Sequence, residues 1–157
     1  MDSLREEDIP EGAILYPSRK DDTDMMLAVK KALAIGAKEI WMFGGLGGRL
    51  DHSYANIQTL AYLLEYGVSG VLMDENHRVS MIADGQREKM SLAYHYSVFA
   101  YGGVCIGVNI TGAEYLLEDA TLMPSFPLGC SNRHAPGKQM EVSVEHGTLL
   151  LIQTKLN

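Results

Sequence analysis

The spacing of apolar residues changes near residue 75, and this change limits the fold more than any other feature of the sequence. Before it, short apolar runs alternate with segments of helical periodicity, in the order strand, helix, strand, helix, strand. After it, only short β-like runs recur, separated by turn dipeptides such as DG, GG, PG and HG. The sequence therefore predicts an α/β domain over residues 1–75, followed by an all-β domain over residues 76–157 that forms an antiparallel sandwich or barrel.

The predicted α/β domain contains two helices, which run from Thr23 to Ile35 and from about Asp51 to Tyr66. Such an alternation implies a parallel sheet with right-handed crossovers. The predicted strands of this domain cover residues 13–17, 39–44 and 70–74. These strands are few for a complete parallel α/β domain, so we expect a partial domain whose N-terminal strands are missing. The predicted strands of the β domain cover residues 78–83, 96–102, 104–110, 140–145 and 148–154.

Composition and charge exclude several classes of function. Of the 157 residues, 46% are hydrophobic and 21% are charged, and the formal net charge is −7. A phosphate backbone repels an acidic chain that has no basic run, so we expect no nucleic-acid partner. No apolar run approaches the roughly 18 residues of a membrane span, so we expect no membrane partner. The two cysteines, Cys105 and Cys130, are too few for a disulfide framework, and a reduced, cytoplasmic location is expected.

The polar run SRKDDTD follows the first predicted strand. In this run, Lys20 stands beside the carboxylates of Asp21, Asp22 and Asp24. Carboxylates at the carboxyl edge of a parallel sheet suit Mg²⁺, which prefers oxygen ligands and is usually shared with substrate phosphates. Alternatively, Thr23 or Asp22 only caps the helix that follows. The spacing leaves both interpretations open.

A glycine-rich loop, GGLGGRLDHSYAN (44–56), joins the second predicted strand to the second predicted helix. It lacks the lysine and hydroxyl of the Walker loop, and it lacks the third glycine of the G-x-G-x-x-G motif. Glycines still let backbone N–H groups approach an anion near a helix N-terminus, where Arg49 could bind phosphate oxygens. Asp51 instead favours a cation, a hydroxyl or an amine. The alternative is a tight turn with Asp51 as the N-cap, and the spacing does not decide between the two.

Several sequence elements together resemble the thiamine pyrophosphokinase family. GGRLDHSYANIQTL (47–60) closely resembles the signature of that family, and KDDTD (20–24), one helix earlier, matches its K-D-x-T-D element. LGCSNRH (128–134) resembles the family's late Ser-Asn motif, and MDS (1–3) resembles the end of its acidic G-D-x-D-S motif. The elements occur in the order found in the family and cover nearly all of the chain.

The resemblance implies an enzyme that transfers pyrophosphate from ATP to the hydroxyl of thiamine, giving thiamine diphosphate and AMP, with Mg²⁺ as cofactor. It also implies that an α/β catalytic domain precedes a thiamine-binding β-sandwich domain. The protein is expected to be a homodimer. Its thiamine pocket would then lie between the catalytic domain of one subunit and the sandwich of the other.

The resemblance also implies roles for individual residues. The metal ligands would be Asp2 and Asp24. The residues near ATP would be Lys20, Asp21, Thr23, Gly47, Gly48, Arg49, His52 and Asn56. The residues near thiamine would be Ser131, Asn132 and Asp51. The catalytic residues would be Asp51, Arg49 and Asp24, and Asp51 would orient the thiamine hydroxyl or accept its proton.

The chain departs from the family pattern in two places. It lacks the strand–helix unit with which the catalytic domain of the family begins, and it lacks a tryptophan that some members place shortly after the Ser-Asn pair. Two alternative functions stay open. One is a truncated, non-catalytic fragment that binds thiamine or only dimerises, and the other is a Mg²⁺-dependent nucleotide hydrolase.

Overall fold

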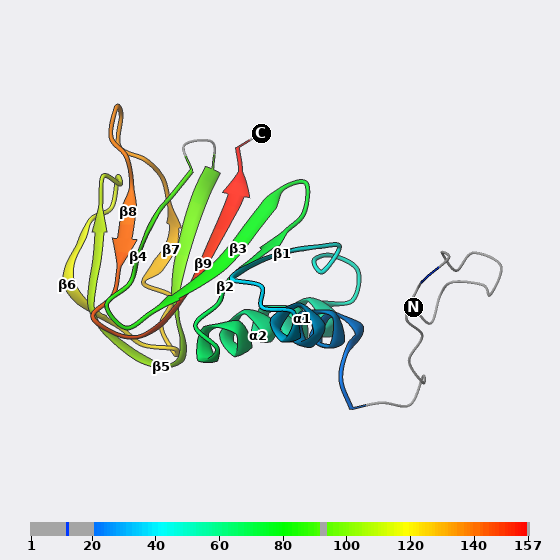
Figure 1. The fold of residues 1–157 in the computed structure, drawn as a ribbon. Coiled ribbons are helices and arrows are strands. Elements are labelled where there is room, and N and C mark those ends of the chain that lie inside the picture. The colour runs from blue at the N-terminus through cyan, green and yellow to red at the C-terminus, as the bar shows by residue number, and fades with distance from the viewer. Residues whose placement is uncertain (1–11, 13–20, 92–93, 157) are drawn as a thin grey trace.

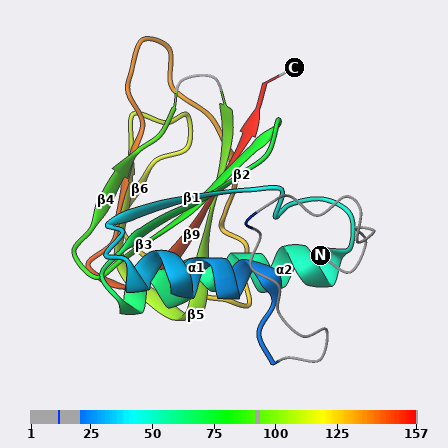
Figure 2. The same ribbon diagram turned by 45° about the vertical axis from the view of Figure 1, so that its right-hand side comes forward.

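The computed structural model of the protein describes residue 12 and residues 21–91 and 94–156. In this part of the chain, two helices lie on one face of a mixed sheet (Figures 1 and 2). Beside the helices, the later strands of the same sheet curl round to form the β region. The predicted fold class, α/β followed by all-β, is confirmed. The strand predicted at residues 13–17 lies outside the described residues. Neither described helix has the length and apolar character that crossing a bilayer requires.

The first helix, α1 (Asp24–Ala34), has nearly the bounds that the sequence predicts. The hydroxyl of Thr23 accepts a hydrogen bond from the backbone N–H of Met26 (3.2 Å), so Thr23 is the N-cap. Val29 points into the core and is 1% exposed. The chain leaves the helix at Gly36, whose φ of 86° is accessible to glycine without strain.

The next three elements form a β-α-β unit, which consists of β1 (Glu39–Phe43), α2 (Leu50–Glu65) and β2 (Ser69–Met73). β1 and β2 pair in parallel over their whole length, as the sequence predicts. α2 approaches the sheet closely, because a Cβ on Gly70 would lie 2.6 Å from Cδ1 of Leu63. A side chain at position 70 of β2 would therefore force the packed leucines of α2 to shift.

The two helices and the sheet share an apolar core, in which Leu60 and Leu63 of α2 meet Leu72 of β2 and Val29 of α1. The three leucines are at most 1% exposed. Burial of one leucine side chain contributes about 1.5–3 kcal/mol. This core packs α2 against β2, the parallel neighbour of β1, and so holds both ends of the loop that joins β1 to α2.

The remaining strands are β3 (His77–Ala83), β4 (Arg87–Lys89), β5 (Tyr94–Thr111), β6 (Leu117–Leu122), β7 (Gly129–Asn132), β8 (Glu141–Ser143) and β9 (His146–Lys155). One nine-stranded sheet contains β1-β2-β3-β9-β5-β8-β4 in this order, and its other two strands, β6 and β7, also pair with β5. β3 pairs antiparallel with both β2 and β9, so the sheet is continuous across the residues where the sequence pattern changes.

β5 differs most from the prediction. Residues 96–102 and 104–110, predicted as two strands, belong to one strand of 18 residues. Its first part pairs with β7 and β9, and its last part pairs with β6 and β8. Its register with β9 shifts between Tyr101 and Ile106, where Gly102 has a φ of 72°. This bulge bends the strand, so that the sheet encloses a second core around Tyr96, Val98, Ile110, Leu149 and Leu151.

Three short strands were not predicted. β4, β6 and β7 have three, six and four residues, respectively. The exposed and buried positions of β6 and β7 do not alternate regularly, and β4 is too short for its alternation to identify a half-buried strand. Their pairing with β8 or β5 decides their conformation.

Candidate active site

The glycine-rich loop connects the carboxyl end of β1 to the first turn of α2. Gly44, Gly47 and Gly48 have φ values of 74°, 83° and 62°, which residues with a side chain rarely adopt. Gly45 is needed for space, because a Cβ on this residue would lie 2.6 Å from Cδ1 of Leu72. The glycines therefore satisfy two requirements, the backbone conformation of the loop and its close contact with the sheet.

Two side chains of α2 hold the loop in this conformation. Nδ2 of Asn56 donates a hydrogen bond to the carbonyl of Gly45 (2.9 Å), and the hydroxyl of Ser53 donates one to the carbonyl of Gly47 (3.1 Å). Asn56 is half-buried, whereas His52, one turn earlier, is exposed. The structure thus gives Asn56 a defined role in shaping the loop, which the sequence did not indicate.

Arg49 and Asp51 form an ion pair at the start of α2. Nε and Nη2 of Arg49 donate to Oδ1 (3.1 Å) and Oδ2 (2.5 Å) of Asp51. The side chains are 74% and 62% exposed, so a ligand could reach both. The helix begins at Leu50 with Arg49 in the N-cap position, so the interpretation of Asp51 as the N-cap is wrong.

The hydrogen bond from Arg49 lowers the pKa of Asp51, and a further hydrogen bond from the backbone N–H of His52 (3.0 Å) acts in the same direction. The same contact with Asp51 raises the pKa of Arg49. Asp51 is therefore a carboxylate at neutral pH, and it can accept hydrogen bonds but cannot donate them.

At the N-terminus of α1, two of the predicted polar residues have structural partners. Both carboxylate oxygens of Asp22 bind Nζ of Lys30, at 2.8 and 2.7 Å. The hydroxyl of Thr23 is engaged as the helix cap. The carbonyl of Thr23 also accepts the backbone N–H of Leu27 (3.0 Å), so Thr23 already has a function in the fold.

Asp21 and Asp24 are exposed at the same end of α1. Among the described residues, no three side chains of His, Cys, Asp or Glu form a group that could hold a metal ion. Asp2 and Lys20, which the resemblance also assigns to the site, lie outside the described residues. The methyl carbon Cε of Met25, the neighbour of Asp24, lies 3.0 Å from the position of a Cβ on Gly45, so the structure brings the first turn of α1 against the glycine loop.

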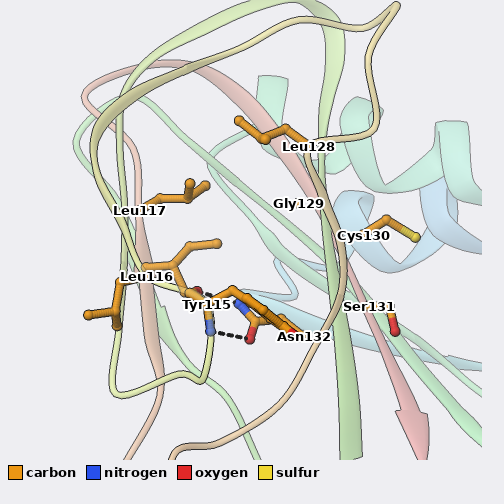
Figure 3. A pocket seen from close by; sticks show the side chains of 9 residues that line it. Tyr115, Leu116, Leu117, Leu128, Gly129, Cys130, Ser131 and Asn132 are labelled. Carbon is orange, nitrogen blue, oxygen red and sulfur yellow. Dashed lines mark hydrogen bonds between the residues drawn. The ribbon is translucent and has the colours of Figure 1, made fainter.

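A pocket of about 520 Å³ lies between the loop that connects β5 to β6 and the segment that contains β7 (Figure 3). Its lining residues are Ile110, Tyr115, Leu116, Leu117, Leu128, Gly129, Cys130, Ser131 and Asn132. Sequence reasoning identified Ser131 and Asn132 but missed the apolar residues and Tyr115. The run YLL (115–117), which belongs to no predicted strand, is the signal that could have found them.

Ser131 and Asn132 are neighbours in sequence but differ in their environment. Ser131 is exposed, has a φ of 61°, and donates its backbone N–H to the hydroxyl of Ser97 (3.1 Å). Figure 3 shows its side chain with that of Cys130, on the other side of β7 from Leu116 and Leu117. Asn132 is 4% exposed, and its side-chain amide binds the backbone of Tyr115.

The glycine-rich loop and the pocket lie in different parts of the chain. In Figure 1 the loop between β1 and α2 is separated from β7 by the intervening strands of the sheet. A single chain therefore does not bring Asp51 together with Ser131 and Asn132, which the resemblance assigns to one ligand.

Comparison with known proteins relates both regions to one family. Residues 1–71 match the family model described as thiamin pyrophosphokinase, catalytic domain. Residues 85–149 match the model described as thiamin pyrophosphokinase, vitamin B1 binding domain. The first match contains the glycine-rich loop, and the second contains the pocket.

Individual relatives agree with these matches. Thiamine pyrophosphokinase from Bacillus subtilis (strain 168) is 28% identical over an alignment of 144 residues that covers 89% of this chain and 66% of the relative. The crystal structure of thiamine pyrophosphokinase from Bacillus subtilis has a TM-score of 0.81 and 25% identity, over 88% of this chain and 66% of that one. The structure from Geobacillus thermodenitrificans shares the fold, with a TM-score of 0.77 and 24% identity over 90% of this chain and 66% of that one. This chain thus spans about two thirds of the length of these relatives.

Proposed function

This chain belongs to the thiamin pyrophosphokinase family, and from this premise we propose that the protein transfers a pyrophosphoryl group from ATP to the hydroxyl of thiamine, giving thiamine diphosphate and AMP. The observation that supports the proposal most is the pair of family matches, with the catalytic domain followed by the vitamin B1 binding domain in one chain. The glycine-rich loop and the pocket provide one candidate region for each substrate.

The glycine-rich loop and the first turn of α1 are the proposed ATP site. Backbone N–H groups of a glycine-rich loop at a helix N-terminus favour phosphate, and Arg49 adds a guanidinium that can bind two phosphate oxygens. Gly47, Gly48, His52 and Asn56 belong to this loop and helix, and Asp21 and Thr23 lie at the adjoining end of α1. Lys20 completes the proposed set.

Phosphoryl transfer of this kind depends on positioning and charge stabilisation. In the proposed reaction, the hydroxyl oxygen of thiamine attacks the β-phosphorus of ATP. The bond from this phosphorus to the oxygen shared with the α-phosphate breaks, and AMP leaves with that oxygen and the electron pair. The ionised carboxylate of Asp51 orients the hydroxyl and accepts its proton, while Arg49 stabilises the charge on the transferred group.

Mg²⁺ is the proposed cofactor, with Asp24 and Asp2 as its ligands. Asp24 fits this assignment because it is exposed in the first turn of α1, where its neighbour Met25 contacts the glycine-rich loop, and because Mg²⁺ prefers oxygen ligands. Mg²⁺ usually takes only one or two carboxylates and completes its shell with water and substrate phosphates, so a larger cluster of acids is not required. When bound, the ion would neutralise part of the charge of the triphosphate.

A homodimer would resolve the separation between the two candidate regions. Within one chain, the glycine-rich loop is separated from the pocket (Figure 1). We propose that the pocket of one subunit faces the glycine-rich loop of the other, so that thiamine held near Ser131 presents its hydroxyl to Asp51. This arrangement requires two subunits for each complete active site.

The proposal is tested by measuring AMP and thiamine diphosphate together, with ATP, Mg²⁺ and thiamine as reactants. We expect both products in equal amounts, and neither when thiamine is omitted. ATP consumption that does not depend on thiamine would instead indicate a nucleotide hydrolase. Calorimetric binding of thiamine without turnover would indicate a non-catalytic binding fragment, and either result would contradict the proposed reaction.

A further inference from the structure

The pocket in the β region opens where two paired segments of the chain diverge. Ala113 and His134 form an isolated bridge, and next to it the backbone N–H of Glu114 donates to the carbonyl of Arg133 (2.8 Å). One residue further, the two backbones no longer bond to each other directly. There the side chain of Asn132 bonds to the backbone of Tyr115, and the pocket begins beyond this contact.

The amide of Asn132 replaces a backbone pair at this point. The N–H of Tyr115 donates to Oδ1 of Asn132 (3.1 Å), and Nδ2 of Asn132 donates to the carbonyl of Tyr115 (2.6 Å), as the dashed lines in Figure 3 show. Oδ1 also accepts the N–H of Arg133 (2.9 Å). Both acceptor positions of Oδ1 and one of the two N–H groups are thus in use, and the residue is 4% exposed. Asn132 is therefore occupied in positioning Tyr115.

Tyr115 is the aromatic residue of the pocket lining. It is 64% exposed, and the other large lining side chains are aliphatic. None of the lining residues, all of which lie in the described part of the chain, carries a charge. The charged neighbours Glu114 and Arg133 are paired with each other through two hydrogen bonds, so neither is free to neutralise a ligand in the pocket.

We infer that Tyr115 recognises the positively charged thiazolium ring of thiamine with the face of its own ring, and that Asn132 is a positioning residue that acts through Tyr115. The inference rests on the proposed function, which supplies the cationic substrate. A cation gains a favourable interaction with the negative face of an aromatic ring, most of all where water is excluded. In a pocket with an uncharged lining, this ring face is the group that distinguishes a cationic ligand from a neutral one of the same shape.

The test compares binding of thiamine with binding of an uncharged analogue in which carbon replaces the thiazolium nitrogen. Calorimetry is done on the wild-type protein and on the Tyr115→Phe and Tyr115→Leu variants. Tyr115→Leu should raise the Kd for thiamine about 2- to 30-fold, whereas the Kd for the neutral analogue should stay the same. Tyr115→Phe keeps a ring face and should bind thiamine as the wild type does. Phe126→Leu is the matched control, because Phe126 is equally exposed (64%) but does not line the pocket.

The positioning role of Asn132 is tested with a double-mutant cycle. Asn132→Ala should weaken thiamine binding as Tyr115→Leu does, and the double variant should lose no more than Tyr115→Leu alone. The KM for thiamine should rise while the KM for ATP stays unchanged. If Asn132→Ala does not fold, Asn132→Ser, which is uncharged and too short to bond to both backbone groups of Tyr115, takes its place.

The outcomes separate this inference from the proposed function. Wild-type binding of thiamine together with an unchanged Kd in Tyr115→Leu, or an equal loss for the charged and the neutral ligand, would overturn the role of Tyr115. Additive losses in the double variant would overturn the positioning role of Asn132. A wild-type protein that binds no thiamine would contradict the proposed function itself, and the inference with it.

Discussion

Arg49 and Asp51 bind each other through two hydrogen-bonded contacts at the first turn of α2, and both side chains remain more than half exposed. In this pair a cation suited to phosphate and a carboxylate suited to a hydroxyl lie next to each other before any ligand binds. The pair explains how a loop without a Walker lysine could still bind ATP, as proposed. It also explains why an acidic residue can lie at a helix N-terminus that is proposed to accept phosphate, since Arg49 offsets its charge.

The first prediction concerns Asp51. Asp51→Asn removes the negative charge but keeps the shape of the side chain. We expect turnover to fall by about 100-fold or more, because the thiamine hydroxyl loses the group that accepts its proton. The melting temperature should stay unchanged, since an exposed ion pair adds little to stability. Steady-state kinetics and thermal unfolding measure the two effects. Glu118→Gln, an exposed change on β6, is the control, and equal turnover in the two variants would remove Asp51 from the reaction.

The second prediction concerns Asp24. Asp24→Asn should lower turnover by at least 10-fold and should raise the Mg²⁺ concentration needed for half-maximal activity, because one metal ligand is weakened. The lost interaction with the helix dipole should lower the free energy of unfolding by about 0.3–1 kcal/mol. A Mg²⁺ titration of the activity, paired with urea unfolding, separates the two. An unchanged Mg²⁺ dependence would exclude Asp24 as a ligand.

The third prediction concerns the glycine-rich loop. Gly45→Ala places a methyl group 2.6 Å from Cδ1 of Leu72 and 3.2 Å from Nδ2 of Asn56, so the side chains must shift and the Asn56 bond to the loop is disturbed. We expect a loss of about 1–3 kcal/mol in the free energy of unfolding, together with a higher KM for ATP. Gly48→Ala is the comparison, because its Cβ meets nothing within 4 Å. Its loss should come only from the positive φ and should be about 1–2 kcal/mol.

The fourth prediction concerns alkaline stability. Tyr96 is 1% exposed and bonds to the His134 ring, and burial raises the pKa of Tyr96 to about 12 from 10.0. A raised native-state pKa adds stability that is fully present below pH 10 and is lost as the pH rises through about 12. For two pKa units this loss is about 3 kcal/mol.

Tyr96→Phe tests this contribution. The free energy of unfolding, measured by urea denaturation at several pH values between 9 and 12, should fall less steeply in the variant than in the wild type. The exposed Tyr115→Phe is the control and should keep the slope of the wild type. Equal slopes for the wild type and Tyr96→Phe would show that Tyr96 does not cause the loss of stability at alkaline pH.

The regular elements of the first half were predictable because their signals are local. Thr23 and Gly36 mark the ends of α1 by their own backbone chemistry, and the periodicity between them shows which face is buried. The same holds for α2, apart from its start, where Leu50 replaces the predicted Asp51. The parallel pairing of β1 and β2 follows from the helix between them.

The second half was less predictable because its signals are not local. The residues 96–102 and 104–110 appear as two strands in the sequence because Gly102 and Gly103 interrupt the apolar pattern. In the structure these glycines form a bulge, and pairing with β9 carries the strand through it. Short strands such as β7 acquire their conformation only from their partner in the sheet.

By itself, the sequence determined the order of the elements in the first half, the family, and the residues proposed to bind ATP, since Arg49, Asp51 and the glycines lie within one short segment. Only the tertiary structure decided which side chains bond to other groups of the protein and where a pocket forms. It pairs Asp22 with Lys30 and bonds the side chain of Asn56 to the glycine-rich loop. It also bonds Asn132 to Tyr115, a residue 17 positions away in the chain. The physical reason is that helix caps and turns depend on neighbouring residues, whereas a pocket wall or a buried amide depends on segments that meet only after the sheet has curled.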